Sequence, residues 1–299
     1  MRKTLLFLIL FAMIGTTATL AQPIANHVVL IGLDGWASYD FEKAHDVPNL
    51  RNLMEGGTFT MHKRSVIPSS SAINWASMFM GVGPEMHGYT TWGSKTPEVP
   101  SITTNKNGIF PTIFSVIREQ LPKAETGCTF EWDGIKYVID TMSISHVCYF
   151  KDGWKHVEEN CDSIVNYIHD KKPVFFAPCF DGIDGIGHEK GWYTEDYYDY
   201  LARIDQCVGR IIQALKDAGI FDDTIIIITG DHGGHDRGHG TLDIRDMESP
   251  LVIYGKNARA NNEMDGVFVQ YDIAATIAYI LGLDIPEAWR GKPVKQAFE

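Results

Sequence analysis

The amino-acid sequence predicts an α/β protein, a three-layer α/β/α sandwich around a mostly parallel central sheet. Short, wholly apolar runs such as Ile225–Ile228 have the length and composition of strands that are buried on both faces. Longer segments with helical spacing of their apolar residues, such as Trp154–His169, lie between these runs. Strands that alternate with helices form parallel sheets with helices packed on each side.

The expected elements follow this alternation along the chain. Four apolar runs are expected as strands, at His27–Leu33, Pro173–Cys179, Thr224–Thr229 and Leu251–Tyr254. Helices are expected at Val47–Met54, Asn74–Met80, Pro111–Leu121, Trp154–His169, Thr194–Ala218 and Tyr271–Leu281. Proline is tolerated in a first helical turn, so Pro48 is compatible with the first of these helices.

Residues 22–299 are expected to form a single domain. Within it, the stretch from about 88 to 153 is less regular and holds turn signals at Pro97, Pro100 and Asn105–Gly108. This stretch is either a small cap inserted over the site or surface structure that packs on the core.

Residues 1–21 are expected to be a signal peptide. Arg2 and Lys3 form a basic start, Leu5–Ile14 an apolar core, and Thr19–Ala21 a cleavage site. The apolar run is shorter than the about 20 residues that span a membrane, and an uncleaved anchor is the alternative. No later segment is apolar enough to cross a membrane. The expected signal peptide therefore predicts an exported protein, periplasmic or secreted.

Composition excludes some classes of function. A formal net charge of −12 argues against a general surface for nucleic acids or anionic membranes, although it does not exclude an anionic substrate. Apolar residues make up 44% of the chain, enough for a packed core. The five cysteines are odd in number and lack a Cys-x-x-Cys spacing, so at least one is free or paired between chains.

Acidic and histidine residues follow the expected strands. Asp231 and His232 come directly after the isoleucine run, and Asp34 ends the first strand. Open α/β sheets bind ligands at the carboxyl ends of their strands. Asp184 and His188 flank a glycine-containing loop that can turn both side chains to one metal ion. For Asp34 alone, capping of a turn is an equal alternative.

A serine run, Ser69–Ser71, precedes the expected helix at Asn74. Ser71 is either an N-cap or a nucleophile for attack on phosphorus, since a helix amino terminus stabilises anions. His239, between two glycines, adds a further metal donor. His235 lies nearby and is either a support for a ligand or a surface residue.

The donor count fits two divalent metal ions, which suit phosphoryl transfer. One ion is expected at Asp184, His188 and His239. The other is expected at Asp34, Asp231, His232 and the Ser71 oxygen. Nitrogen and carboxylate donors favour zinc over magnesium, and manganese or iron stays open.

The order of these pieces resembles the alkaline phosphatase superfamily, in particular its type I phosphodiesterase and nucleotide pyrophosphatase branch. The matching motifs are Gly32-Leu-Asp34-Gly35, Pro68-Ser-Ser-Ser71-Ala-Ile-Asn74-Trp75, Gly81-Val-Gly-Pro84-Glu-Met-His87-Gly88, Asp184-Gly-Ile-Gly-His188, Asp231-His232-Gly233 and Gly238-His239-Gly240. The resemblance implies an alkaline phosphatase-like catalytic domain, catalytic roles for Ser71 and Asn74, two zinc ions at the ligands above, and a Ser71-phosphoryl intermediate.

The sequence departs from the family at the position of an asparagine that contacts the phosphoryl oxygen, where Trp92 stands. Thr90, Thr91 or a backbone amide is the candidate to replace it. Trp75, Thr91 and Trp92 are the expected substrate-binding residues, with core or rim packing as the alternative for the aromatic ones. The residues after Ser71 lack the proline and arginine of the sulfatase signature, and the chain is short for the branch.

These observations predict an exported di-metal phosphohydrolase that acts on a small phosphodiester or phosphoanhydride. A phosphomonoesterase is the closest alternative. A monoester carries an extra negative charge, and no basic residue flanks Ser71 to meet it, which favours the diester. A binding protein for glycans or phospho-ligands, without catalysis, is the alternative of another class. The sequence makes no prediction of oligomeric state.

Overall fold

The computed structural model describes residues 22–299, and the expected leader lies outside the described residues. Eight strands form one sheet in the order β4-β3-β5-β1-β6-β7-β2-β8. The strands are β1 (His27–Leu33), β2 (Thr58–Arg64), β3 (Thr126–Phe130), β4 (His146–Tyr149), β5 (Phe175–Phe180), β6 (Thr224–Gly230), β7 (Glu248–Gly255) and β8 (Asn262–Glu263). Among the described strands, only the pairs that involve β7 are antiparallel, which confirms the mostly parallel sheet.

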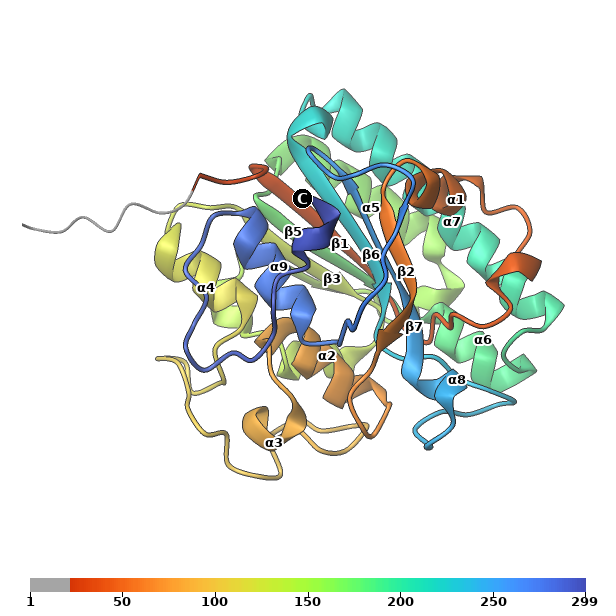
Figure 1. Cartoon of the computed structure of the whole chain (residues 1–299), viewed down its shortest axis with the longest axis horizontal. Coiled ribbons are helices and arrows are strands. Elements are labelled where there is room, and N and C mark those ends of the chain that lie inside the picture. The colour runs from red at the N-terminus through yellow and green to blue at the C-terminus, as the bar shows by residue number, and fades with distance from the viewer. Residues whose placement is uncertain (1–21) are drawn as a thin grey trace, which may run out of the picture.

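Helices cover both faces of this sheet (Figure 1). One face carries α2 (Ser71–Met80), α4 (Ile113–Gln120) and α9 (Asp272–Ile280), and the other carries α1 (Pro48–Glu55), α5 (Val157–Lys171), α6 (Gly182–Lys190) and α7 (Glu195–Asp217). Alternate residues of β1 enter different cores, Val28 and Leu30 on one side and Val29 and Ile31 on the other. The central strands are therefore apolar at successive positions, and the three-layer prediction is confirmed.

The predicted strands and helices are present, with ends shifted by a few residues. Sequence reasoning missed β2, β3, β4, β8 and the short helices α3 (Pro84–His87) and α8 (Ile244–Met247). In the stretch from 88 to 153, β3 and β4 join the central sheet, whereas residues 88–112 contain no helix or strand. The expected cap or surface structure thus includes part of the sheet itself.

One local prediction was wrong. The segment from Asp184 to His188 was expected as a loop, yet it lies within helix α6. Both its glycines are held in the helix because α6 packs on α7, and Gly187 lies against the ring of Trp192, where a Cβ atom would come within 2.7 Å. Tertiary packing here overrides the low helix propensity of glycine.

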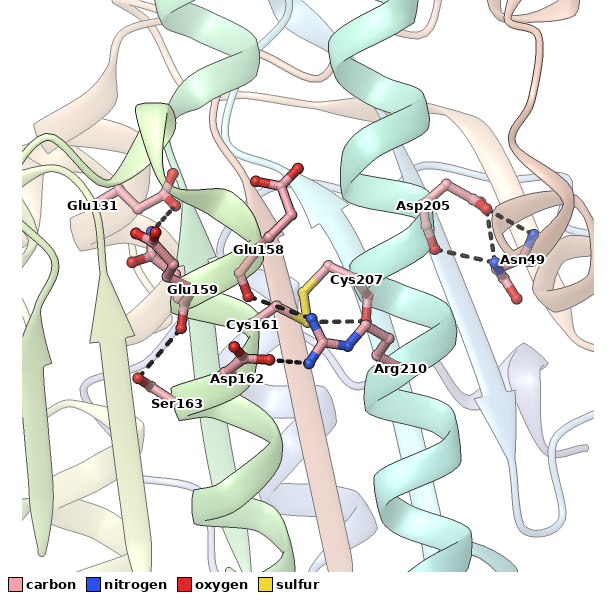
Figure 2. The surroundings of a disulfide bond; sticks show 11 residues. Asn49, Glu131, Glu158, Glu159, Cys161, Asp162, Ser163, Asp205, Cys207 and Arg210 are labelled. Carbon is pink, nitrogen blue, oxygen red and sulfur yellow. Dashed lines mark hydrogen bonds and ion pairs between the residues drawn. A yellow bond between two sulfur atoms is a disulfide. The ribbon is translucent and has the colours of Figure 1, made fainter.

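A disulfide between Cys161 and Cys207 joins α5 to α7, on the face of the sheet that also carries α1 and α6 (Figure 2). Arg210 of α7 pairs with Asp162 of α5 next to it. The other three cysteines, Cys128, Cys148 and Cys179, are free thiols in the structure. Among residues 22–299, no helix combines the length and apolar character needed to cross a membrane.

Candidate metal centre

Strand register brings the candidate ligands to one edge of the sheet. Leu33, the last residue of β1, pairs with Phe180 of β5 on one side and Gly230 of β6 on the other. The three parallel strands therefore end level with one another. Asp34 and Asp231 follow directly, and α6 begins two residues after β5. This is the edge at which open α/β sheets place their ligands.

Asp184, His188 and His239 form a first group, with one donor atom of each within 4.8 Å of the others. The Nε2 atom of His188 lies 3.4 Å from Asp184 Oδ2, and that of His239 lies 3.6 Å from Asp184 Oδ1. Helix α6 accounts for the first contact, because residues four apart share one face of a helix. The first expected ligand set is thus brought together.

The second group shares Asp34 and His232 with the expected set and also contains Asp184, which was expected only in the first set. Asp34, Asp184 and His232 lie within 4.8 Å of one another, so Asp184 belongs to both groups. Asp231 is adjacent, with its Oδ2 atom 3.5 Å from His232 Nε2, and the Ser71 hydroxyl lies 3.3 Å from that same nitrogen. The donor cluster is the set of all seven expected ligands, Asp34, Ser71, Asp184, His188, Asp231, His232 and His239.

The three histidines share one hydrogen-bonding pattern. Each Nδ1 donates to a backbone carbonyl: His188 to Arg237 (3.0 Å), His232 to Gly233 (2.7 Å) and His239 to Ser69 (3.0 Å). A proton on Nδ1 leaves the lone pair on Nε2, which is the atom that faces the carboxylates. Metal-binding histidines are oriented in the same way by a partner on the other ring nitrogen.

Three carboxylate oxygens in the cluster are buried without a hydrogen-bond partner among the described residues: Asp34 Oδ1, Asp184 Oδ1 and Asp231 Oδ2. Burial and the neighbouring carboxylates raise the pKa of Asp34 and of Asp184. Burial raises the pKa of Asp231 to about 6 and lowers that of His232 to about 4. Leaving such groups unpaired is costly, and a cation would satisfy them. The residues therefore fit a metal centre.

In Asp34 and Asp231, the second carboxylate oxygen accepts a hydrogen bond that fixes the side chain. Trp75 Nε1 donates to Asp34 Oδ2 at 3.0 Å, and the backbone N–H of Gly35 donates to Asp231 Oδ1 at 3.1 Å. Gly35 has a φ of 69°, and a Cβ atom there would lie 3.0 Å from Asp184, so glycine is required. Trp75, for which substrate binding and core packing were the two expectations, is fully buried and does not line the pocket beside Ser71.

Ser71 is the first residue of α2, and Ser70 occupies the N-cap position, so the N-cap alternative for Ser71 is wrong. Within the described chain, the hydrogen bonds of the Asn74 side chain all go to backbone groups that precede α2. Its Oδ1 accepts from the N–H of Val66, and its Nδ2 donates to the carbonyls of Val66, Pro68 and Ser70. Asn74, expected to have a catalytic role, thus fixes the backbone that leads into Ser71.

A pocket of about 640 Å³ opens beside Ser71. The residues that line it are Pro68, Ser70, Ser71, Ile73, Thr90, Thr91, Trp92, Trp132, Asp181, Asp184, His188, His239 and Gly240. Trp92 is 66% exposed and stacks on Trp132, with ring centroids 6.4 Å apart. The expected substrate-binding residues Thr91 and Trp92 therefore border the pocket next to the donor cluster.

Sequence reasoning missed Trp132 and Asp181. Trp132 follows β3, whose Thr-Gly-Cys-Thr-Phe sequence lacks the apolar run of a recognisable strand. Asp181 directly follows β5, and its position after a buried strand was a usable signal. His235, left open by the sequence, pairs with Asp246 at 2.6 Å and lies outside the cluster.

Lys63 of β2 was also missed. It is fully buried, and its ammonium group donates to the Gly230 carbonyl at 2.9 Å and to Gln270. Burial lowers its pKa to about 7. A register shift between Thr60 and Lys63 turns this side chain inward, a feature that strand alternation alone does not predict.

The model of the type I phosphodiesterase/nucleotide pyrophosphatase family matches residues 28–249 of the chain. The human bis(5'-adenosyl)-triphosphatase ENPP4 is 25% identical over 240 residues, covering 77% of this chain and 52% of that protein. Mouse ectonucleotide pyrophosphatase/phosphodiesterase family member 1 is 24% identical over 246 residues, covering 77% of this chain and 27% of that protein. The chain thus spans about half the length, or less, of these relatives.

Solved structures show the same fold. Murine ectonucleotide pyrophosphatase/phosphodiesterase 5 in complex with AMP superposes with a TM-score of 0.72 at 15% identity, covering 92% of this chain and 100% of that one. A 2-O GAG sulfatase gives 0.71 at 13% identity, covering 92% of this chain and 74% of that one. With the match over residues 28–249, the chain belongs to the type I phosphodiesterase/nucleotide pyrophosphatase family, within the alkaline phosphatase superfamily.

Proposed function

We propose that the protein hydrolyses phosphodiesters or phosphoanhydrides, with Ser71 as nucleophile and two divalent metal ions in the donor cluster. The observation that carries this proposal is the convergence of three unpartnered carboxylate oxygens and three Nε2 atoms beside the Ser71 hydroxyl. A binding protein without catalysis has no need of a hydroxyl in that place.

Asp184, His188 and His239 would hold one metal ion, and Asp34, Asp231, His232 and Ser71 the other, with Asp184 close to both. Histidine and carboxylate donors favour zinc, with manganese and iron as alternatives. Such a pair of ions lowers the pKa of a bound hydroxyl and stabilises the charge on attacking and leaving oxygens.

The chain's own residues supply the nucleophile and orient the substrate. Ser71 Oγ attacks phosphorus, the ester bond to the leaving group breaks, and a Ser71-phosphoryl intermediate forms. Water then attacks the same phosphorus and the bond to Oγ breaks, which regenerates the serine. Ser71 starts the ten-residue helix α2, whose amino terminus stabilises the phosphoryl charge.

Charge favours a diester over a monoester. No lysine or arginine is among the residues that line the pocket in the described chain, so the extra negative charge of a monoester has no cationic side chain to meet it. The protein should hydrolyse bis-p-nitrophenyl phosphate faster than p-nitrophenyl phosphate. The reverse ranking would make it a phosphomonoesterase.

A Ser71→Ala variant tests the nucleophile. It should lose at least about a thousandfold in kcat on bis-p-nitrophenyl phosphate while its metal content stays unchanged. Ser70→Ala, one residue earlier, is the matched control and should keep most of the activity. An acid quench of the wild-type reaction should trap a p-nitrophenylphosphoryl group on Ser71, detected by mass spectrometry of the peptide. Full activity in Ser71→Ala would refute the mechanism.

We further propose export and a single catalytic domain over residues 22–299. The disulfide between Cys161 and Cys207 supports export, because disulfides persist in oxidising compartments. The continuous eight-stranded sheet supports one domain, since strands from the first to the last third of the chain pair in it. Cell fractionation would test the compartment, and limited proteolysis would test the domain.

A further inference from the structure

We propose that Asp246 is a positioning residue for one of the two metal ions. Its buried carboxylate holds together the loop of residues 233–241, and this loop orients both histidines of the first ligand group. The inference rests on the proposed function and adds a residue that lies outside the donor cluster. Asp246 belongs to the short helix α8 and is fully buried. A buried carboxylate is costly unless it is hydrogen-bonded, so its partners identify the structure that it holds in place.

Asp246 binds the loop at its start, its middle and its end. The carbonyl of Asp246 accepts from the N–H of Gly233 at 2.9 Å. Its Oδ1 atom accepts from His235 Nδ1 at 2.6 Å, and its Oδ2 atom accepts from the N–H of Thr241 at 2.9 Å and from the Thr241 hydroxyl at 2.6 Å. Between these points, His235 and Gly238 exchange two backbone hydrogen bonds of 2.9 and 3.0 Å. One residue therefore closes the loop on itself.

The closed loop acts on both histidines of the first ligand group. It carries His239, whose Nε2 atom lies 3.6 Å from Asp184 Oδ1. The carbonyl of Arg237, in the middle of the loop, accepts from Nδ1 of His188 at 3.0 Å. The ring of His188 therefore depends on the loop as well, although His188 itself belongs to α6. Partners of this kind set the orientation of metal-binding histidines and contribute to metal affinity.

The two halves of the loop are held in different ways. The first half is packed tightly, because a Cβ atom on Gly234 would lie 2.2 Å from the ring of Trp192. The second half carries His239 and ends at Thr241, which donates two hydrogen bonds to the Asp246 carboxylate. Removal of that carboxylate should therefore move His239 more than the start of the loop.

The second ligand group is held independently of the Asp246 side chain. Asp34 and Asp231 directly follow β1 and β6. His232 donates from Nδ1 to the carbonyl of Gly233 at 2.7 Å, and Gly233 in turn bonds to the backbone carbonyl of Asp246, which a change of side chain leaves in place. A substitution of Asp246 should therefore weaken the binding of the first metal ion and spare the second.

Zinc affinity in Asp246→Asn tests the inference. Asparagine keeps the size of the side chain but turns an N–H₂ group toward donors, so hydrogen bonds to His235 or Thr241 are lost. Titration of the metal-free full-length protein with zinc against a chromogenic chelator should show one ion bound about 10–100-fold more weakly than in the wild type, and the other within about twofold. Asp205→Asn is the matched control, because Asp205 is also a fully buried carboxylate that accepts from backbone N–H groups. It should lose stability but keep both affinities.

Two further variants assign the weakened ion. His239→Ala removes a ligand of the first ion, so the addition of Asp246→Asn to it should leave the affinity of the remaining ion unchanged. Thr241→Val removes only the hydroxyl donor at an exposed position, and it keeps the inference testable if Asp246→Asn does not fold. It should weaken the same ion by about three- to tenfold.

The outcomes separate this inference from the proposed function. Wild-type affinities for both ions in Asp246→Asn, or in Thr241→Val if Asp246→Asn does not fold, would overturn the positioning role even if bis-p-nitrophenyl phosphate is hydrolysed. Equal weakening of both ions, or the same weakening in Asp205→Asn, would also overturn it. Selective loss of one ion in a protein that binds zinc but hydrolyses no ester would support the role of Asp246 and refute the proposed function alone.

Discussion

The donor cluster and the tryptophan wall, the side of the pocket formed by Trp92 and Trp132, lie next to each other, yet they are built in different ways. Every carboxylate and histidine of the cluster except His188 is mostly buried, and each histidine is oriented by a backbone carbonyl. The wall is exposed at Trp92 and depends on a loop tied by Glu98. The comparison indicates that strand ends hold the donor cluster, whereas a loop outside the sheet forms the neighbouring wall of the pocket.

Substitution of the shared ligand should have the largest effect. Asp184→Asn removes a charge that lies in both ligand groups, so both metal ions should be lost and activity should fall by at least about a thousandfold. Asp205→Asn is the matched control, because Asp205 is a buried carboxylate remote from the cluster that accepts from Leu50 and Asn49. Metal analysis should show loss only in Asp184→Asn. Retention of both ions would contradict the shared role.

Metal removal should lower the stability of the protein, because it takes the cation out of the donor cluster. The buried carboxylates repel one another without a cation, so chelation should lower Tm, by the equivalent of about 4 kcal/mol if metal is present at a thousandfold above Kd. Differential scanning calorimetry before and after dialysis against a chelator measures the shift. Chelation should change the Tm of the Asp184→Asn variant little, because that variant should already lack the metal ions. Equal Tm values with and without metal in the wild type would mean that the cluster binds no ion.

Loss of the Trp75 hydrogen bond should weaken the cluster without removing a ligand. Trp75→Phe frees Asp34 Oδ2, so zinc affinity should fall by about 10–100-fold. Trp289→Phe loses a similar bond, from its ring N–H to the Pro111 carbonyl, which involves no residue of the donor cluster. Both variants should lose stability, but competition with a chromogenic chelator should reveal weaker zinc binding only in Trp75→Phe.

Loosening of the wall should have the smallest effect and leave the cluster intact. Glu98→Ala removes the acceptor that ties Thr90 and Ser94, so amide hydrogen exchange in residues 89–94 should rise. KM for bis-p-nitrophenyl phosphate should increase by about two- to fivefold, with kcat nearly unchanged. Glu119→Ala, at an exposed position of α4, is the control. A large fall in kcat would show that the wall also serves the chemistry.

The cluster could be predicted from the sequence because its signals are local. Asp34 and Asp231 follow apolar runs, and a ligand at the end of a buried strand has a known place in a parallel sheet. The sequence did not predict that Asp184 and His188 lie on a helix, because two glycines between them argued for a loop. Packing of α6 on α7 and of Gly187 on Trp192 decided that geometry.

The wall could not be predicted in the same way. Trp92 was identified by its position in a motif, but its partner Trp132 follows a strand without an apolar run. Their contact joins residues 40 positions apart and depends on the placement of β3 in the sheet. Trp75 is the converse case: the sequence left substrate binding and core packing open for it, and the fold buries it with its ring N–H donating to Asp34.

Metal content with reactivation tests the central claim most directly. The purified protein should contain about two zinc ions per chain by plasma mass spectrometry, lose hydrolysis of bis-p-nitrophenyl phosphate on chelation, and recover it when zinc is restored. Hydrolysis that persists after complete removal of metal, or a protein that binds no divalent ion after reloading, would contradict the account.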